Sequence, residues 1–482
     1  MSSQALVKEV QLPAQLTTKA QVNGYLFLLQ RFDHALVRRD VRMLHDPMRI
    51  QCRSWITGFV LAVLVAGGCA VLGFLHPQGQ VGDSRIIMDS DSGALYVMVD
   101  KTLHPVLNLA SARLVAGSGA APASVAETKL SDIPRGSLLG IPGAPATLPG
   151  PSSDRSAWTL CDDAGSGLTA TVLDGNPQLG PQLRRATAGE ALLATQGGAS
   201  YLVYDGRHAR VDTANAAIES ALHLRGTAPR PMGTGLLNAT VPAPDLAVPA
   251  IPNAGAPSAV RSAPVGTVIS VEGAEPGSAT LYVALADGIQ TVSPFTAEVL
   301  RTANSMGRNE MTRVAPDAIR GIPVVHTLPI DQFPDQRPTI VSADAAPIAC
   351  AAWARGPHDP AAQLRVLIGT QLPLPDGAQP LHLVGGGKGA MADAAFVPPS
   401  TGEFVQVTGV EPDSTRRDGL YYITDTGVRF GIPDAATATV LGLSPPKLAP
   451  WQIIDQLPSG PMLDRHSALV ARDTVPVDGP AR

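Results

Sequence analysis

The longest uninterrupted apolar stretch of the chain runs from Trp55 to Leu75, 21 residues without a charge. At about 1.5 Å per residue, a helix of this length spans roughly 30 Å, the thickness of the hydrocarbon core of a bilayer. The pattern predicts one transmembrane helix. A signal peptide would have a shorter apolar core and basic region, and Cys69 as a lipoprotein cleavage site meets the same objection. Burial in a soluble core is the remaining alternative.

Before this stretch, apolar residues recur at intervals of three and four. They are Val22, Tyr25, Leu26, Leu29, Phe32 and Leu36. This spacing predicts a helix that begins with the capping box of Thr18 and Gln21 and runs to about Arg39. Its apolar stripe indicates either a helix lying on the lipid surface or a helix that docks onto a partner. We expect a second short helix, capped by Asp40 and ended before Pro47.

For the docking alternative, the candidate contact residues are Val22, Tyr25, Leu29, Phe32 and Leu36.

After the apolar stretch, one strand pattern containing tyrosine recurs four times, at 95–100, 200–206, 281–288 and 420–427. Each is followed by a second short strand and then by a helix. The expected N-caps of these helices are Asn108, Asp212, Ser293 and Asp434, and the expected helices are 109–115, 213–222, 295–303 and 435–441. A Pro-x-Gly-x-x-Leu motif follows in three copies, beginning at Pro134, Pro231 and Pro458, whereas the third copy has 328–331 there. The sequence therefore predicts a ββα unit used four times.

The uneven spacing of the units leaves extra chain at about 151–195 and 338–410, from which we infer a central β domain. The expected fold class is α+β, a single-pass membrane protein with an elongated exported domain of four ββα-type repeats around this central domain. The expected boundaries are 1–54 for the cytoplasmic segment, 55–75 for the membrane helix, 76–150 for repeat 1, 151–195 for the first segment of the central domain, 196–250 for repeat 2, 251–275 for a connector or central strand, 276–337 for repeat 3, 338–410 for the second segment of the central domain, 411–470 for repeat 4 and 471–482 for the tail.

Charge orients the membrane helix. The first 54 residues carry eight basic and four acidic side chains, a net charge of +4, and the remainder carries −9, which together give the −5 of the whole chain. The positive-inside rule therefore predicts that the amino terminus is cytoplasmic and that the larger part is outside. Because the larger part is acidic and its arginines are scattered, the sequence has no nucleic-acid-binding character.

Two of the four cysteines, Cys161 and Cys350, fall in the exported part. Disulfides persist outside the membrane, and each cysteine lies three residues from a tryptophan, Trp158 or Trp353, in mirrored order. We predict a disulfide between them, with two unpaired buried thiols as the alternative. Without nearby histidines the pair is a poor zinc site.

Motifs of catalysis are missing from the sequence. The segment 385–389 has neither the leading glycine nor the final Ser or Thr of a phosphate-binding loop, so we interpret it as a surface loop. Asp89 to Gly93 begins like a calcium loop, but position 6 is Ala94 and position 12 is Asp100, which favours a turn. No catalytic residue, cofactor or metal site is predicted.

Several longer segments together carry a family resemblance. They are 17–29, 34–40, Asp46-Pro47, 77–79, 103–114, 140–145 and Ala449-Pro450-Trp451. Through them the chain resembles EccB, a core component of the mycobacterial type VII (ESX) secretion system. The resemblance implies an inner-membrane complex with EccC, EccD, EccE and the mycosin protease, and a periplasmic domain that self-associates. It also carries an ATPase label, which is the sole indication of ATP.

Three functions follow as hypotheses. The first is a structural and assembly role in a secretion complex, in the inner membrane with the bulk of the chain periplasmic. The second is an extracytoplasmic nucleotide hydrolase, and the third is a module that binds the cell wall through the repeats.

Overall fold

The computed structural model describes residues 18–39, 47–75, 82–273, 278–308, 310–386, 391–443 and 445–474. The chain divides into two compact units, residues 1–80 and 81–482. The expected short helix after Asp40 lies outside the described residues, as do the end of the tail from residue 475 and residues 387–389 of the glycine-rich loop.

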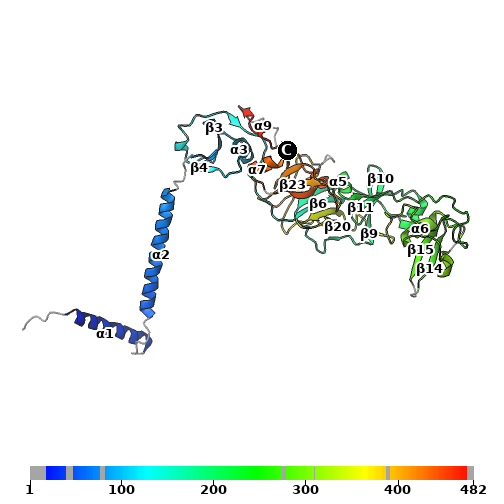
Figure 1. Ribbon diagram of the computed structural model, residues 1–482, viewed down its shortest axis with the longest axis horizontal. Coiled ribbons are helices and arrows are strands. Elements are labelled where there is room, and N and C mark those ends of the chain that lie inside the picture. The colour runs from blue at the N-terminus through cyan, green and yellow to red at the C-terminus, as the bar shows by residue number, and fades with distance from the viewer. Residues whose placement is uncertain are drawn as a thin grey trace, which may run out of the picture. The chain divides into compact units, whose positions relative to one another are not determined.

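The first unit contains helices α1 (Lys19–Arg38) and α2 (Pro47–Leu75) (Figure 1). As predicted, Thr18 and Gln21 form a capping box at the start of α1, in which Gln21 Oε1 accepts from the Thr18 amide at 2.9 Å. Pro47 is the first residue of α2. This position suits proline, because the first amide of a helix needs no partner within it.

The second unit contains four sheets of one strand order, in which three antiparallel strands, a helix and a fourth strand follow one another along the chain. The fourth strand returns parallel to the first, so the order in space is third, second, first, fourth. We call each sheet with its helix a module.

The first module contains β1 (Ile86–Asp89), β2 (Leu95–Val99), β3 (Thr102–Pro105), α3 (Leu109–Ala116) and β4 (Ala123–Val125). The second contains β9 (Glu190–Gln196), β10 (Ala199–Tyr204), β11 (Arg207–Arg210), α4 (Ala216–Leu222) and β12 (Arg230–Pro231), with β13 (Val241–Pro242) and β18 (Thr339–Ile340) added. The third contains β14 (Val268–Glu272), β15 (Ala279–Ala284), β16 (Ile289–Thr291), α6 (Pro294–Ala303) and β17 (Thr312–Val314). The fourth contains β23 (Gly402–Thr408), β24 (Leu420–Thr424), β25 (Arg429–Ile432), α7 (Ala435–Val440) and β26 (Lys447–Pro450).

The modules correct the predicted ββα unit, because a strand precedes each tyrosine strand and another follows each helix. A short helical segment comes after each fourth strand; these are η1 (Glu127–Lys129), α5 (Thr234–Asn238), η2 (Pro316–Ile319) and α8 (Trp451–Ile454). Three of the four predicted helix caps are confirmed, at Asn108, Ser293 and Asp434. The cap at Asp212 is wrong: Asn215 accepts the first amides of α4.

After that helical segment, the chain returns beside the third strand of each module. In the first and fourth modules Pro134 and Pro458 accept hydrogen bonds there from Leu103 and Arg429. The copies of the proline motif at Pro134 and Pro458 therefore lie at the same structural position. The copy at Pro231 is not equivalent to them, because Pro231 lies on β12.

In the third module Pro323 takes this position, accepting from the Ile289 amide at 2.9 Å, so residues 328–331 are not its equivalent.

The central sheet has the order β21-β22-β7-β6-β19-β20-β8. Its strands are β6 (Ser156–Asp163), β7 (Thr169–Asp174), β8 (Leu183–Arg185), β19 (Ile348–Arg355), β20 (Gln363–Gly369), β21 (Leu381–His382) and β22 (Ala394–Phe396). Strands β6 and β19 are antiparallel, in a register that pairs Cys161 with Cys350 and Trp158 with Trp353. The disulfide between the two cysteines is present, so the pairing inferred from the mirrored tryptophans is confirmed.

Three apolar cores connect the sheets of the second unit. One core contains side chains of the first and fourth modules, another those of the second and third. The third joins the central sheet to the second and fourth modules. Neighbours in space therefore run first, fourth, central, second, third (Figure 1). The small pair β5 (Leu138–Leu139) and β27 (Ala471–Arg472) and the helix α9 (Arg465–Ala468) complete the unit.

Candidate functional site

The apolar stripe of α1 is exposed to solvent along its length. Its predicted docking residues are exposed by 46% at Val22, 64% at Tyr25, 44% at Leu29, 66% at Phe32 and 78% at Leu36. A row of large apolar side chains is unfavourable in water unless a lipid or protein surface covers it. Asp33 interrupts the row, because it is four residues from Leu29 and three from Leu36 and so lies on the same face.

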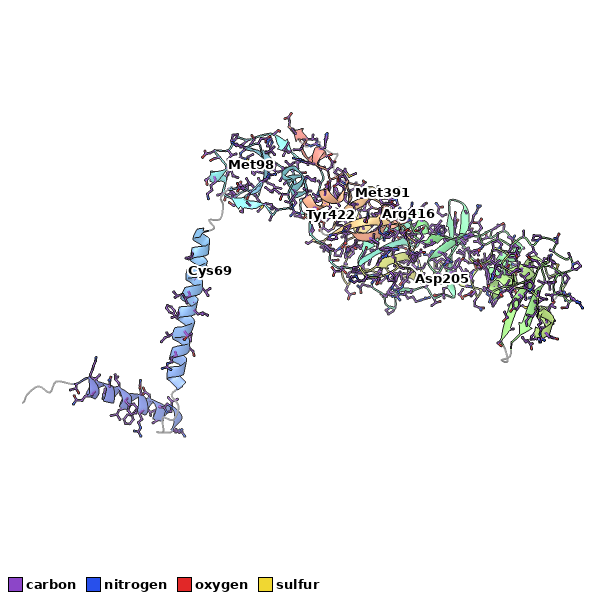
Figure 2. All side chains as sticks on the ribbon, viewed as in Figure 1. Cys69, Met98, Asp205, Met391, Arg416 and Tyr422 are labelled. Atoms are coloured by element: carbon purple, nitrogen blue, oxygen red, sulfur yellow. A yellow bond between two sulfur atoms is a disulfide. The ribbon has the colours of Figure 1, made fainter. Side chains whose placement is uncertain are left out.

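Helix α2 is long and apolar enough to cross a bilayer. The qualifying segment, Arg53–Val71, has a mean hydropathy of 2.0, and none of it is buried within the structure. Cys69 is a free cysteine on this helix and is exposed (Figure 2). Burial within a soluble core, the alternative left open above, finds no support in the described residues of this unit.

The sequence segments that carry the family resemblance hold the first module together. Asn108 caps α3 by accepting from the Ser111 amide at 2.9 Å, and its Nδ2 donates to the Ile141 carbonyl at 2.8 Å. The Ser111 hydroxyl accepts from the Ile141 amide at 2.9 Å. From the same helix, Arg113 Nη1 donates to Leu441 O of the fourth module at 2.6 Å. The segments 103–114 and 140–145 are therefore structural.

In the fourth module, one fixed contact involves the segment 449–451 and a second lies outside these segments. Trp451, at the start of α8, lies under the Arg429 guanidinium, whose carbon is 4.9 Å from the ring centre. Arg429 also pairs with Asp455 at 2.9 Å. On β24, Tyr422 is almost fully buried and donates its hydroxyl to the Pro149 carbonyl at 3.0 Å. The contact between Trp451 and Arg429 gives the segment 449–451 a structural role.

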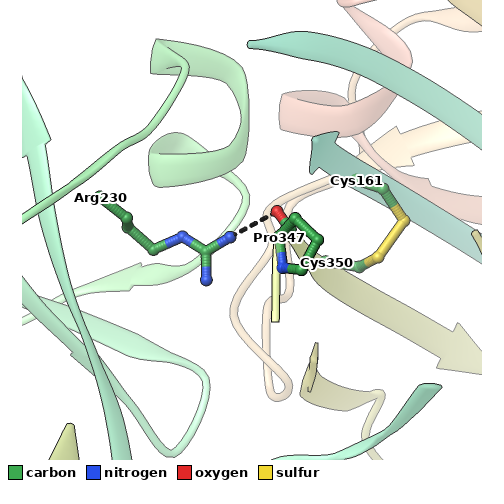
Figure 3. The surroundings of a disulfide bond; sticks show 4 residues. All are labelled: Cys161, Arg230, Pro347 and Cys350. Atoms are coloured by element: carbon green, nitrogen blue, oxygen red, sulfur yellow. Dashed lines mark hydrogen bonds between the residues drawn. A yellow bond between two sulfur atoms is a disulfide. The ribbon is translucent and has the colours of Figure 1, made fainter. Parts of the chain in front are cut away.

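Next to the disulfide, a buried charge joins the central sheet to the second module. Arg230 on β12 is 2% exposed and donates to Pro347 O at 2.7 Å, three residues before Cys350 (Figure 3). Asp162 on β6, also 2% exposed, accepts from the Gly233 amide at 2.7 Å. Burial raises the pKa of Asp162 to about 6, and the Gly233 amide and Arg230 oppose that rise.

A second buried charge cluster joins the central sheet to the fourth module. Lys447 on β26 forms an ion pair with Glu403 on β23 and donates to Ser153 O at 2.8 Å. Asp174 on β7 is 6% exposed, and its Oδ2 forms no hydrogen bond within the described residues. Burial, with added repulsion from Glu403, raises the pKa of Asp174 to about 8, while Lys447 opposes the rise. Burial therefore favours the protonated form of Asp174.

Sequence reasoning did not find these two clusters. Their members are ordinary charged residues up to 273 positions apart, counting from Asp174 to Lys447, and no local motif marks them. The calcium-like segment is the turn between β1 and β2, as expected, where Asp89 accepts from the Asp91 amide at 3.1 Å. Of the glycine-rich loop, Gly385 and Gly386 lie in a turn after β21.

Residues 14–477 match the family described as "Type VII secretion system ESX-1, transport TM domain B". The chain belongs to this family. EccB proteins are core components of type VII secretion systems, and this chain is a component of that kind.

Two relatives illustrate how far the similarity extends. The "ESX-3 secretion system ATPase EccB3" of Mycolicibacterium smegmatis is 38% identical over 97% of this chain and 93% of that protein. The "ESX-5 secretion system ATPase EccB5" of Mycobacterium tuberculosis is 36% identical over 96% and 95%. Both EccB names contain the word ATPase, yet the full sequence has no Gly-x-x-x-x-Gly-Lys-Ser/Thr motif.

Solved EccB structures share the fold. A chain of the intact ESX-5 inner membrane complex matches 98% of this chain and 99% of its own length, with a TM-score of 0.74 and 35% identity. A chain of the EccB3 dimer from the ESX-3 core complex matches 80% of this chain and all of its own length, with a TM-score of 0.71 and 35% identity.

Proposed function

We propose that this EccB protein is a scaffold subunit of a type VII secretion complex. In this proposal α2 anchors the chain in the inner membrane, α1 remains in the cytoplasm and the second unit builds the periplasmic side. The observation that carries it is the near-complete match to a subunit of an intact inner-membrane complex. The orientation rests on the excess of basic residues before α2.

The role of α1 in this scaffold is to dock onto cytoplasmic parts of partner subunits, for which EccC, EccD and EccE are the candidates. Asp33 favours a protein over lipid as the surface that covers the stripe. An ionised carboxylate within an apolar stripe is costly to insert among acyl chains, whereas a protein partner can supply a donor to it. Phe27, which is 54% exposed and lies outside the stripe, adds apolar surface that a helix lying on lipid would leave in water.

The second unit supplies the rigid part of the scaffold. We interpret its four modules as copies of one repeated unit, since all four have the same strand order. Stacked modules form an extended surface without needing one large core. The relative that was solved as an EccB3 dimer supports self-association of this unit.

The test is the native mass and subunit content of the complex that the tagged full-length chain forms when it is extracted from membranes in mild detergent. We expect a mass several times the 49.9 kDa of the chain, with other membrane subunits of the secretion system present. Recovery of the chain alone, at a mass of one copy plus detergent, would contradict the proposal.

The name ATPase carried by the relatives makes nucleotide hydrolysis a second candidate function. It requires the purified chain to turn over ATP at enzyme-like rates and to lose turnover on a defined substitution. If the rate is equal in samples of an unrelated membrane protein purified in the same way, this candidate fails.

A further inference from the structure

A basic pocket opens on the face of the central sheet that carries the disulfide. Along β19, Cys350, Ala352 and Ala354 alternate with the side chains of the opposite face. The two alanines are among the residues lining a pocket of about 390 Å³. Because an alanine side chain is a single methyl group, this part of the sheet is left hollow.

Three arginines line the same pocket. Arg365 on β20 is directly opposite Ala352 in the register, and Arg185 on β8 is opposite Leu367, two residues further along β20. Arg155, just before β6, is the third. Desolvation lowers the pKa of Arg365, and repulsion by Arg185 and Arg155 lowers it further, so the positive charges of Arg185 and Arg155 both act on Arg365.

Acidic side chains do not balance this charge. Arg155 pairs with Asp359 at 3.1 Å, but among the described residues neither Arg185 nor Arg365 has an ion pair. The neighbouring Arg184, in contrast, has an acidic partner. Both its Nη atoms are 2.7 Å from the carboxylate oxygens of Glu190. Two unpaired positive charges therefore remain at the pocket, on a chain whose net charge is −5.

We propose that this pocket binds a phosphate group of a phosphate-bearing ligand. A net charge of two matches a dianionic phosphate better than a single carboxylate, and guanidinium groups bind phosphate oxygens through paired hydrogen bonds. The pocket volume lies within the range of small-ligand sites. No carboxylate lines the pocket, so nothing in the lining repels an anion.

The test measures binding of inorganic phosphate to the full-length chain in phosphatidylcholine nanodiscs by calorimetry at constant ionic strength. The variants are Arg365→Gln and Arg185→Gln, singly and together. Arg365 is half-buried and Arg185 is exposed. If Arg365→Gln fails to fold, Arg185→Gln still tests the proposal, because an exposed side chain can be changed without disturbing the fold. The matched control is Arg225→Gln, which removes the same charge from a side chain 93% exposed in the second module.

We expect each pocket variant to weaken phosphate binding about tenfold or more, because a hydrogen bond to a charged group is lost, and the control to bind like the wild type. Wild-type chain that does not bind millimolar phosphate, or a control that weakens binding as much as the pocket variants, overturns the proposal. Competition identifies the ligand source. Displacement by vesicles of phosphatidylcholine with phosphatidic acid, but not by phosphatidylcholine alone, supports a lipid headgroup, and no displacement supports a soluble phosphate compound.

Discussion

Buried charges fasten the central sheet to the modules on either side of it. Arg230 and Asp162 do so toward the second module, and Lys447, Glu403 and Asp174 toward the fourth. A buried charge is costly unless it is paired, and Asp174 has one oxygen without a hydrogen bond in the described part of the chain. The second cluster should therefore respond to pH.

The first prediction concerns Asp174. Because burial raises its pKa to about 8 in the folded chain, the folded state binds its proton more tightly than the unfolded state. This group therefore lowers the free energy of unfolding as pH rises from about 4 to about 8. Asp174→Asn should be close to wild type at pH 4 and more stable at pH 8, by about 1–3 kcal/mol.

Urea unfolding at several pH values measures this difference. Asp376→Asn is the control, because it removes a carboxylate from an exposed position nearby in the same unit. A stability difference between Asp174→Asn and wild type that does not change between pH 4 and pH 8 would count against the assignment.

The second prediction concerns the disulfide. The bond closes a loop between cysteines 189 residues apart, and removal of a native disulfide typically costs about 2–4 kcal/mol. The double variant Cys161→Ala/Cys350→Ala should lose about this much unfolding free energy while keeping its sheet, since six other residue pairs beyond the cysteines and tryptophans join β6 to β19. Cys69→Ala, which removes an unpaired thiol, should leave the stability of the second unit unchanged in the same melting experiment.

At the scale of elements, local chemistry predicted the helices better than the sheets. The caps at Asn108, Ser293 and Asp434 are side-chain oxygens that accept amides of the same helix, and such a contact is visible in a few consecutive residues. At Asp212 the side chain accepts from Ala214 in a turn instead, which delays the start of α4. The first strand of each module was missed because its identity depends on pairing with the tyrosine strand that follows it.

The third prediction concerns the stripe on α1. Val22→Asp and Leu29→Asp place a charge among its apolar side chains, and burying an unpaired charge against a partner costs several kcal/mol. Each variant should release the chain from its complex while the second unit melts as in wild type. Asn23→Asp, which adds the same charge outside the stripe, should still co-purify with the partner subunits. Equal co-purification of all three variants would show that the stripe is not the docking surface.

At the scale of the whole molecule, the sequence did not predict which modules are neighbours. The first and fourth modules share a core, and Arg113 and Leu441, which bond across it, are separated by 328 residues. Periodicity within the sequence does not report such contacts. The disulfide was an exception, because only two of the four cysteines follow the predicted membrane helix. The arginine pocket was not predicted either, since Arg155, Arg185 and Arg365 meet only through the strand order of the central sheet.

The central claim is that α2 separates a small cytoplasmic segment from a large periplasmic unit. Labelling with a membrane-impermeant maleimide in intact spheroplasts tests it most directly, in a chain with Cys52→Ser and Cys69→Ser and one new cysteine. A cysteine introduced by Arg225→Cys in the second unit should be labelled at once, and one introduced by Gln30→Cys in α1 only after lysis. Labelling of the α1 cysteine in intact spheroplasts, or protection of the cysteine in the second unit until lysis, would contradict the account.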